Sequence, residues 1–124
     1  MPARKPKIER IGNMILLKRD QWKDHTATIS DYPVLLDEVM KYTWTYYESD
    51  HPYLKCGKLN TSLHKFVLAF LYGADQLNHM LNNDNIIEHL DNDGLNCAYD
   101  NLHIISADYN KAKAFTIDKE RALE

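Results

Sequence analysis

The chain has 124 residues, the length of one domain with one modest hydrophobic core. Hydrophobic residues make up 44% of it and charged residues 27%, and no apolar run approaches the roughly 20 residues that cross a membrane, so the composition is that of a soluble globular protein. Asp and Glu number 18 against 15 Lys and Arg, and the net charge of −3 argues against a protein that is basic over its whole surface.

The first part of the chain is expected to be a flexible basic arm followed by a strand. Residues 1–12 contain four Lys and Arg residues and two prolines, so they form either a solvated tail or an arm that lies on nucleic acid. Met14–Lys18 is a short apolar run and is predicted to be a strand. The polar segment 21–29 is ambiguous.

A strand-rich half with helices is expected over residues 14–73. Apolar residues at helical spacing predict a short helix over 34–42, and the apolar run 63–72, which continues until Gly73, predicts a buried helix. Aromatic and β-branched residues at 42–47 are typical of a strand. Further elements are predicted as strands at 53–56 and 59–63, and as a short helix followed by a loop over 74–85.

The C-terminal module, residues 86–119, is predicted to be a strand, a long loop, a strand and a helix. Residues 86–89 form the first strand, and a turn is expected at Asn92-Asp93-Gly94. The apolar run 102–105 is the returning strand. Ser106 is a good helix N-cap, so a helix should follow from the next residue to the end of this module.

This order of elements and residues resembles the ββα-metal nuclease module of the HNH family. The similarity is to the subclass whose third signature residue is Asn, which is common among homing endonucleases. Glu88-His89 matches the acidic residue and histidine at the end of the first strand. Asn101, in an Asn-Leu pair that opens the second strand, matches the middle Asn, and Asn110, in the first turns of the helix, matches the last.

The resemblance extends upstream of the module with less specific residues. Leu63-His64-Lys65 is similar to the Leu-His-Arg found before the motif in many members, so the resemblance covers roughly residues 34–113. It implies an α+β fold, in which a small antiparallel sheet with helices is followed by a C-terminal ββα-metal module. The whole chain, residues 1–124, is then expected to be a single domain.

The resemblance also implies a metal-dependent DNA endonuclease or nickase. His89 would be the general base that takes a proton from water, and Asn101 would orient it by hydrogen bonding. Glu88 and Asn110 would hold one divalent ion, Mg²⁺ or Mn²⁺, since carboxylate and amide oxygens suit hard ions. Neighbours on a strand leave opposite faces, so a kink is expected to bring Glu88 and His89 into one site. Candidates for supporting or phosphate contacts are His64, His103, Lys111 and Lys113.

Several residues depart from the family pattern and indicate an alternative function. Glu88 replaces the more usual Asp, and His103 stands where members often carry Arg. The loop between the two strands is acidic, with Asp91, Asp93 and Asp100, and an acidic surface can occupy a DNA-binding groove of another protein. The alternative is a catalytically degenerate HNH-fold binding protein from a mobile element that inhibits a host defence nuclease of the CRISPR or restriction type. A DNA-binding transcription protein without catalysis agrees less well with the charge.

The two cysteines, Cys56 and Cys97, form no Cys-x-x-Cys pattern and so no zinc ribbon. They are expected to be reduced thiols, although a disulfide between them stays open. The N-terminal residues are too polar for a signal peptide. We expect a monomer or homodimer that acts on DNA in the cytoplasm of a bacterial host cell and is encoded by a phage or mobile element.

Overall fold

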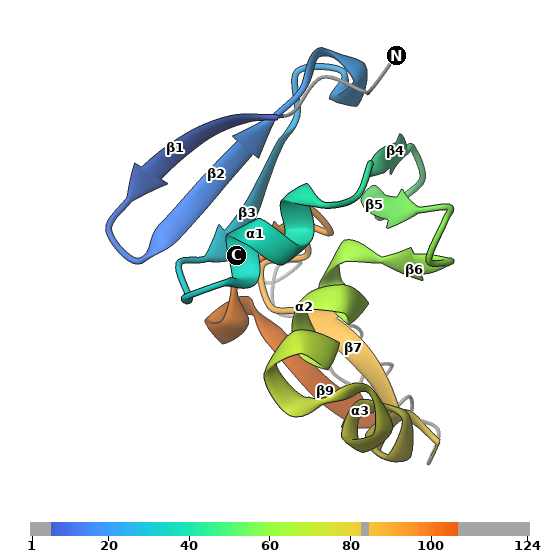
Figure 1. Ribbon diagram of the computed structural model, residues 1–124. Coiled ribbons are helices and arrows are strands. Elements are labelled where there is room, and N and C mark those ends of the chain that lie inside the picture. Colours follow the sequence, from blue (N-terminus) through green and yellow to red (C-terminus); the bar gives the residue numbers. More distant parts are fainter. Residues whose placement is uncertain (1–5, 83–84, 107–124) are drawn as a thin grey trace, which may run out of the picture.

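Three small sheets and three short α-helices make up the part of the chain that the computed structural model describes, residues 6–82 and 85–106 (Figure 1). This mixture of helices and mainly antiparallel strands confirms the predicted α+β class. Residues 107–124, where the last helix of the module is predicted, lie outside the described residues. No helix in the described ranges is long and apolar enough to cross a membrane.

The first sheet is a meander of three strands, to which a short fourth strand adds from the C-terminal part. Its order is β1 (Lys7–Ile11), β2 (Met14–Lys18), β3 (Thr26–Ser30) and β8 (Asn96–Cys97), and the last pair is parallel. Alternate residues of β2 and β3 are buried, namely Ile15, Leu17, Ala27 and Ile29. The alternation of side chains along a strand therefore places one face of this sheet on the core.

Strand β1 corrects the prediction of a flexible arm over residues 1–12. It pairs with β2 along its whole length, and Gly12 makes the turn between them with a φ of +61°. All its side chains are exposed. The strand is therefore held by its backbone hydrogen bonds, and it has no buried face whose apolar spacing would predict it. Residues 1–5 are not among those described.

Two tryptophans join the segments that lie before the second sheet. This sheet consists of β4 (Thr45–Tyr47), β5 (Tyr53–Cys56) and β6 (Thr61–Ser62), and it follows α1 (Leu35–Met40) and the 3₁₀ turn η1 (Asp20–Trp22). The indole N–H of Trp22 donates to the carbonyl of Trp44 at 2.9 Å, and the indole N–H of Trp44 donates to the carbonyl of Val39 at 2.9 Å. Both rings are buried, so each polar N–H is satisfied inside the core.

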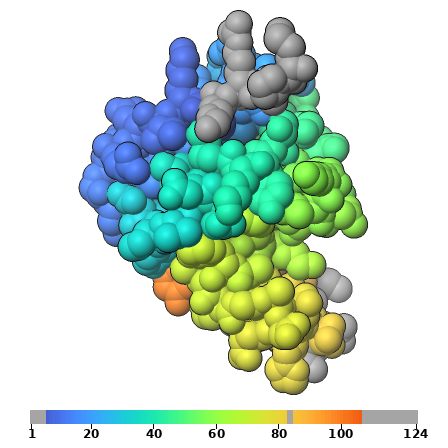
Figure 2. Space-filling view, in the orientation of Figure 1, coloured from blue at the N-terminus to red at the C-terminus, as the bar shows by residue number. Residues whose placement is uncertain are grey.

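Two helices pack against a two-stranded hairpin in the C-terminal part. Helix α2 (Leu63–Tyr72) has the predicted bounds, and α3 (Ala74–Leu81) follows it. Strand β7 (Asn85–His89) pairs antiparallel with β9 (Leu102–Ser106). Both predicted strands of the module are thus present. Figure 2 shows α2 and α3 at the lower end of the molecule, below α1.

The loop between β7 and β9 returns to the first half of the molecule. It supplies β8 to the first sheet, and the amide of Thr28 donates to the carbonyl of Leu95 at 2.9 Å. Gly94 lies against the backbone of Pro52, where a side chain has no room. Leu95 and Cys97 belong to the buried cluster that the first two sheets also form. The loop thereby places the end of β7 beside the turn that precedes β5.

Candidate active site

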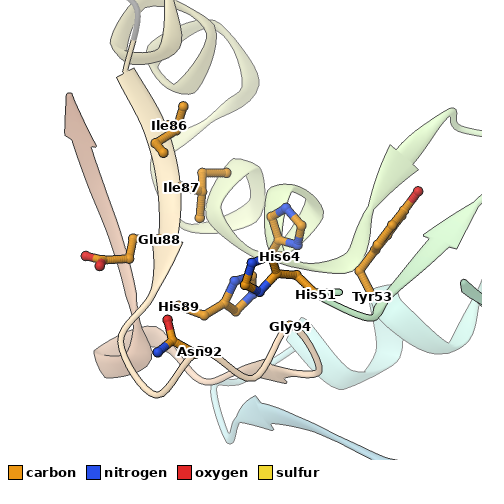
Figure 3. Close-up of a pocket in the computed structure, with 9 residues that line it drawn as sticks. All are labelled: His51, Tyr53, His64, Ile86, Ile87, Glu88, His89, Asn92 and Gly94. Atoms are coloured by element: carbon orange, nitrogen blue, oxygen red, sulfur yellow. The ribbon is translucent and has the colours of Figure 1, made fainter. Parts of the chain in front are cut away.

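A pocket of about 300 Å³ opens where the end of β7, the start of α2 and the turn before β5 meet (Figure 3). Each of these segments contributes a histidine, in order His89, His64 and His51. Figure 3 shows the three side chains gathered on one side of β7. The other lining residues are Tyr53, Ile86, Ile87, Glu88, Asn92 and Gly94. The fold therefore brings together His89 and His64, two residues that the sequence analysis singled out.

His64 and His89 pack edge to face inside this pocket. Their ring centroids lie 4.8 Å apart, and their planes are at 85°. Nε2 of His64 is 3.0 Å from the hydroxyl oxygen of Ser62. Nδ1 of His64 and Nε2 of His89 are buried and have no hydrogen-bond partner within the described part of the chain. Two polar atoms without a partner therefore occur at one place.

Burial keeps both imidazoles in the neutral form. It is the main reason that the pKa of His64 is lowered to about 4, and the charges of His89 and Lys65 act in the same direction. Burial also lowers the pKa of His89, although Asp91 and Asp93 oppose this effect. At neutral pH each ring therefore has a nitrogen lone pair that can accept a proton or bind a metal ion.

Asn101 organises the loop after His89 rather than the imidazole itself. Its side-chain amide donates to the carboxylate of Asp91 and to the carbonyl of Asn96, both at 2.9 Å, and its side-chain oxygen accepts from the amide of Asp91 at 3.1 Å. Its main-chain carbonyl accepts from the amide of Leu90 at 2.9 Å. The expected hydrogen bond to the His89 ring is not among those that the described residues form. Asn101 thus positions His89 through the two residues that follow it.

The acidic loop is held by further hydrogen bonds to its own carboxylates. Asp91 accepts from the side chain of Asn96 at 2.8 Å and from the amide of Asp93 at 2.9 Å, and Asp93 accepts from the amide of Leu95 at 3.0 Å. Burial raises the pKa of Asp91, but the hydrogen bonds from Asn96, Asp93 and Asn101 outweigh burial and lower this pKa overall. The carboxylate of Asp91 is therefore ionised and engaged within the loop.

Replacing Asn101 with alanine should loosen this loop. The substitution removes three side-chain hydrogen bonds and leaves their partners at Asp91 and Asn96 without them, so the free energy of unfolding is expected to fall by about 1–3 kcal/mol. Urea denaturation followed by tryptophan fluorescence measures the loss. The control is Asn78→Ala, at an exposed position of α3, which should change stability by no more than about 0.5 kcal/mol. Equal stability of the two variants would contradict the role assigned to Asn101.

Glu88 and His103 lie on the other face of the hairpin from the two imidazoles. They are opposite each other in the register of β7 and β9, whereas His89 is opposite Leu102. Strand β7 stays regular through His89, so the expected kink is not found and neighbouring side chains leave opposite faces. Figure 3 shows the carboxylate of Glu88 directed away from His64 and His89. His103 lines a separate pocket beside α2.

The donor atoms beside His89 are nitrogen and sulfur rather than oxygen. His64, His89 and Cys97 each offer one ligand atom, and these atoms lie within 4.8 Å of one another. An oxygen-rich group of three such residues does not occur in residues 6–82 and 85–106. Mg²⁺ and Mn²⁺ prefer oxygen ligands, and of the two oxygen ligands that the resemblance implies, Asn110 lies outside the described residues.

The remaining expected site residues lie outside the described part of the chain, namely Asn110, Lys111 and Lys113. The structure adds His51 and Cys97 to the region around His89. Neither could be paired from the sequence, because the turn before β5 and the loop after β7 meet only in the fold. No protein-family model matches the chain, and neither curated proteins nor solved structures show a significant match to it.

Proposed function

We propose that the chain is a metal-dependent DNA endonuclease or nickase that hydrolyses a phosphodiester bond with His89 as the general base. The observation that supports this most is the environment of His89, whose pKa is lowered at the edge of an open pocket. A neutral imidazole in such a pocket suits the removal of a proton from an attacking water molecule. The order of Glu88-His89, Asn101 and Asn110 along the chain also agrees with the HNH pattern.

Three residues have a defined part in this proposal. His89 takes the proton of the water that attacks phosphorus. Asn101 holds the loop after His89, and the His64 ring packs against the His89 ring. The resemblance assigns a divalent ion to Glu88 and Asn110, whereas the described groups next to His89 are nitrogen and sulfur donors. Metal dependence is therefore a separate part of the proposal.

Cleavage of supercoiled plasmid DNA by the purified chain tests both parts. With Mg²⁺ or Mn²⁺ present, relaxed circles are expected to accumulate in proportion to protein and time, and a chelator should stop their formation. Nicking that continues in chelator would support the hydrolysis part of the proposal and reject the metal requirement. The absence of nicking at micromolar protein would reject the nuclease proposal as a whole.

A second candidate function, inhibition of a host defence nuclease, is favoured by the acidic loop. Asp91, Asp93 and Asp100 are all exposed, on the loop next to the pocket. A surface of this charge suits the basic DNA-binding groove of a partner. Under this alternative, an excess of the chain should slow DNA cleavage by a CRISPR or restriction nuclease, while the plasmid assay on the chain alone stays negative.

A further inference from the structure

Three side chains with metal-binding atoms meet beside the pocket, two of them from its lining and the third, Cys97, from the core behind it. His64 lies in the first turn of α2, His89 ends β7, and Cys97 ends β8. Their ligand atoms lie within 4.8 Å of one another. Cys97 is fully buried, and both histidines are partly buried. The fold, rather than a local sequence motif, therefore assembles this group.

Each of the two imidazoles has a ring nitrogen without a hydrogen-bond partner in the part of the chain that the structure describes, and a cation between the rings could bind both nitrogens. Nδ1 of His64 and Nε2 of His89 are buried without a partner in the described residues. A buried polar atom in this state destabilises the fold, and native proteins contain few of them. A single cation that binds both lone pairs would remove both costs at once. The thiol of Cys97 makes only a 3.8 Å contact, with the carbonyl of Gly94.

The other ring nitrogen of His64 has the kind of contact that metal-bound histidines usually make. Its Nε2 lies 3.0 Å from the hydroxyl oxygen of Ser62, which can accept the ring N–H. Histidines that bind metal through one nitrogen commonly donate the other N–H to an oxygen, which fixes the tautomer and the ring orientation. The contact with Ser62 is therefore compatible with the tautomer of His64 that leaves Nδ1 free to bind an ion.

We propose that His64, His89 and Cys97 bind one transition-metal ion of the zinc type, with water in the fourth position towards the open pocket. A set of two imidazole nitrogens and one thiolate binds Zn²⁺ and similar ions in preference to Mg²⁺. Three protein ligands with one open position are also a common arrangement for Zn²⁺ in proteins. Burial raises the pKa of the Cys97 thiol, so the ion must displace the thiol proton when it binds.

The geometry requires only a small closing movement of the three side chains. Zn–N bonds of about 2.0–2.1 Å and Zn–S bonds of about 2.3 Å place tetrahedral ligand atoms about 3.3–3.6 Å apart. The atoms of this group lie within 4.8 Å of one another, so the largest separation would shorten by about 1 Å. Rotation of the His64 and His89 rings and of the Cys97 side chain can supply a change of this size.

Occupation of this site has a consequence for hydrolysis that rests on the proposed function. An imidazole bound to a metal through Nε2 carries its proton on Nδ1, so it has no lone pair left to accept another proton. Zinc on His89 would therefore stop this residue from acting as a base. The ion would also lock the end of β7 to α2 and β8.

Titration of the chelator-treated chain with Co²⁺ tests the site without any measurement of hydrolysis. Co²⁺ takes the same ligands as Zn²⁺ and reports them by absorption. We expect intense visible bands of a tetrahedral ion and a near-ultraviolet band of thiolate-to-cobalt charge transfer, both complete at one ion per chain. One equivalent of Zn²⁺ should then abolish both. Weak absorption of the six-coordinate type, without the charge-transfer band, would overturn the proposal.

Matched cysteine variants identify the thiolate. Cys97→Ala should remove the charge-transfer band and weaken Co²⁺ binding at least about 10-fold, since even the loss of an outer contact to a metal ligand costs this much. Cys56→Ala, which changes the other buried cysteine, should keep the band. If Cys97→Ala does not fold, His64→Gln should show the same loss of affinity. A full band in Cys97→Ala, or unchanged affinity in His64→Gln, would overturn the assignment. Failure of this titration leaves the plasmid result untouched, so the two proposals are tested separately.

Discussion

Replacing His89 with glutamine is expected to lower the rate of plasmid nicking by about 100- to 10,000-fold, which is the range that a general base contributes. Glutamine is similar to histidine in length and polarity, but its amide does not accept a proton near neutral pH. The side chain packs against His64 at the edge of the pocket rather than in the centre of the core, so the fold should tolerate the change. A time course with equal amounts of folded protein measures the ratio of the two rates.

The control for this variant is His79→Gln. His79 is exposed on α3 and is not among the residues that line the pocket, so this variant should nick at the wild-type rate. DNA affinity, measured by mobility shift in chelator, should differ by less than about twofold between wild type and His89→Gln, because a base contributes mainly in the transition state. Wild-type nicking by a folded His89→Gln protein would show that His89 is not the base.

Acid is expected to destabilise the metal-free chain through His64. The pKa of this buried histidine is lowered from 6.5 to about 4 in the folded protein, whereas the unfolded chain keeps the ordinary value. Below pH 6.5 the unfolded state therefore binds a proton that the folded state does not. The contribution of His64 is fully present above pH 6.5 and is lost as the pH falls to about 4, and it amounts to about 3 kcal/mol in the free energy of unfolding.

Urea denaturation between neutral pH and pH 4, with chelator present, measures this loss. His64→Gln cannot take up the proton, so its stability should fall less steeply with pH than that of the wild type. The exposed variant His79→Gln should follow the wild-type curve. Parallel curves for wild type and His64→Gln would mean that His64 is not the group whose protonation opposes folding.

The elements that the sequence predicted well are those that local patterns determine. The apolar run of α2 ends at Gly73, whose φ of +89° suits glycine, and the predicted bounds agree with the structure. The pairing of β7 with β9 likewise follows from two apolar segments separated by a turn signal. In both segments the residues that decide the structure are close together in the chain.

The elements that were missed depend on distant partners or on the backbone alone. Strand β1 has no buried side chain, so nothing in its residue types distinguishes it from a solvated tail. Strand β8 is formed by a parallel pairing of Asn96–Cys97 with Thr28–Ile29, which joins the two halves of the chain. No local propensity encodes a pairing of this kind, because its stability comes from the rest of the sheet.

The candidate site was predictable only in part for the same reason. His89 and Asn101 were singled out by the resemblance to the HNH motif, and the alternation along a strand indicated that Glu88 and His89 point apart unless the strand bends. The approach of Cys97 to the two imidazoles follows from the return of the loop to the first sheet, where Gly94 fits against Pro52. This contact joins remote segments, and spacing along the sequence carries no information about it.

The role of His89 as the proton acceptor is best tested by the nicking rate of His89→Gly with imidazole added to the solution. The glycine variant removes the proposed base and widens the pocket, so a free imidazole can take the place of the missing ring. If an imidazole at this position accepts the proton, added imidazole should raise the rate of this variant in a saturable way and leave the wild-type rate unchanged. A folded His89→Gly protein whose nicking is the same with and without imidazole, beside an active wild type, would contradict the claim that an imidazole at this position accepts the proton.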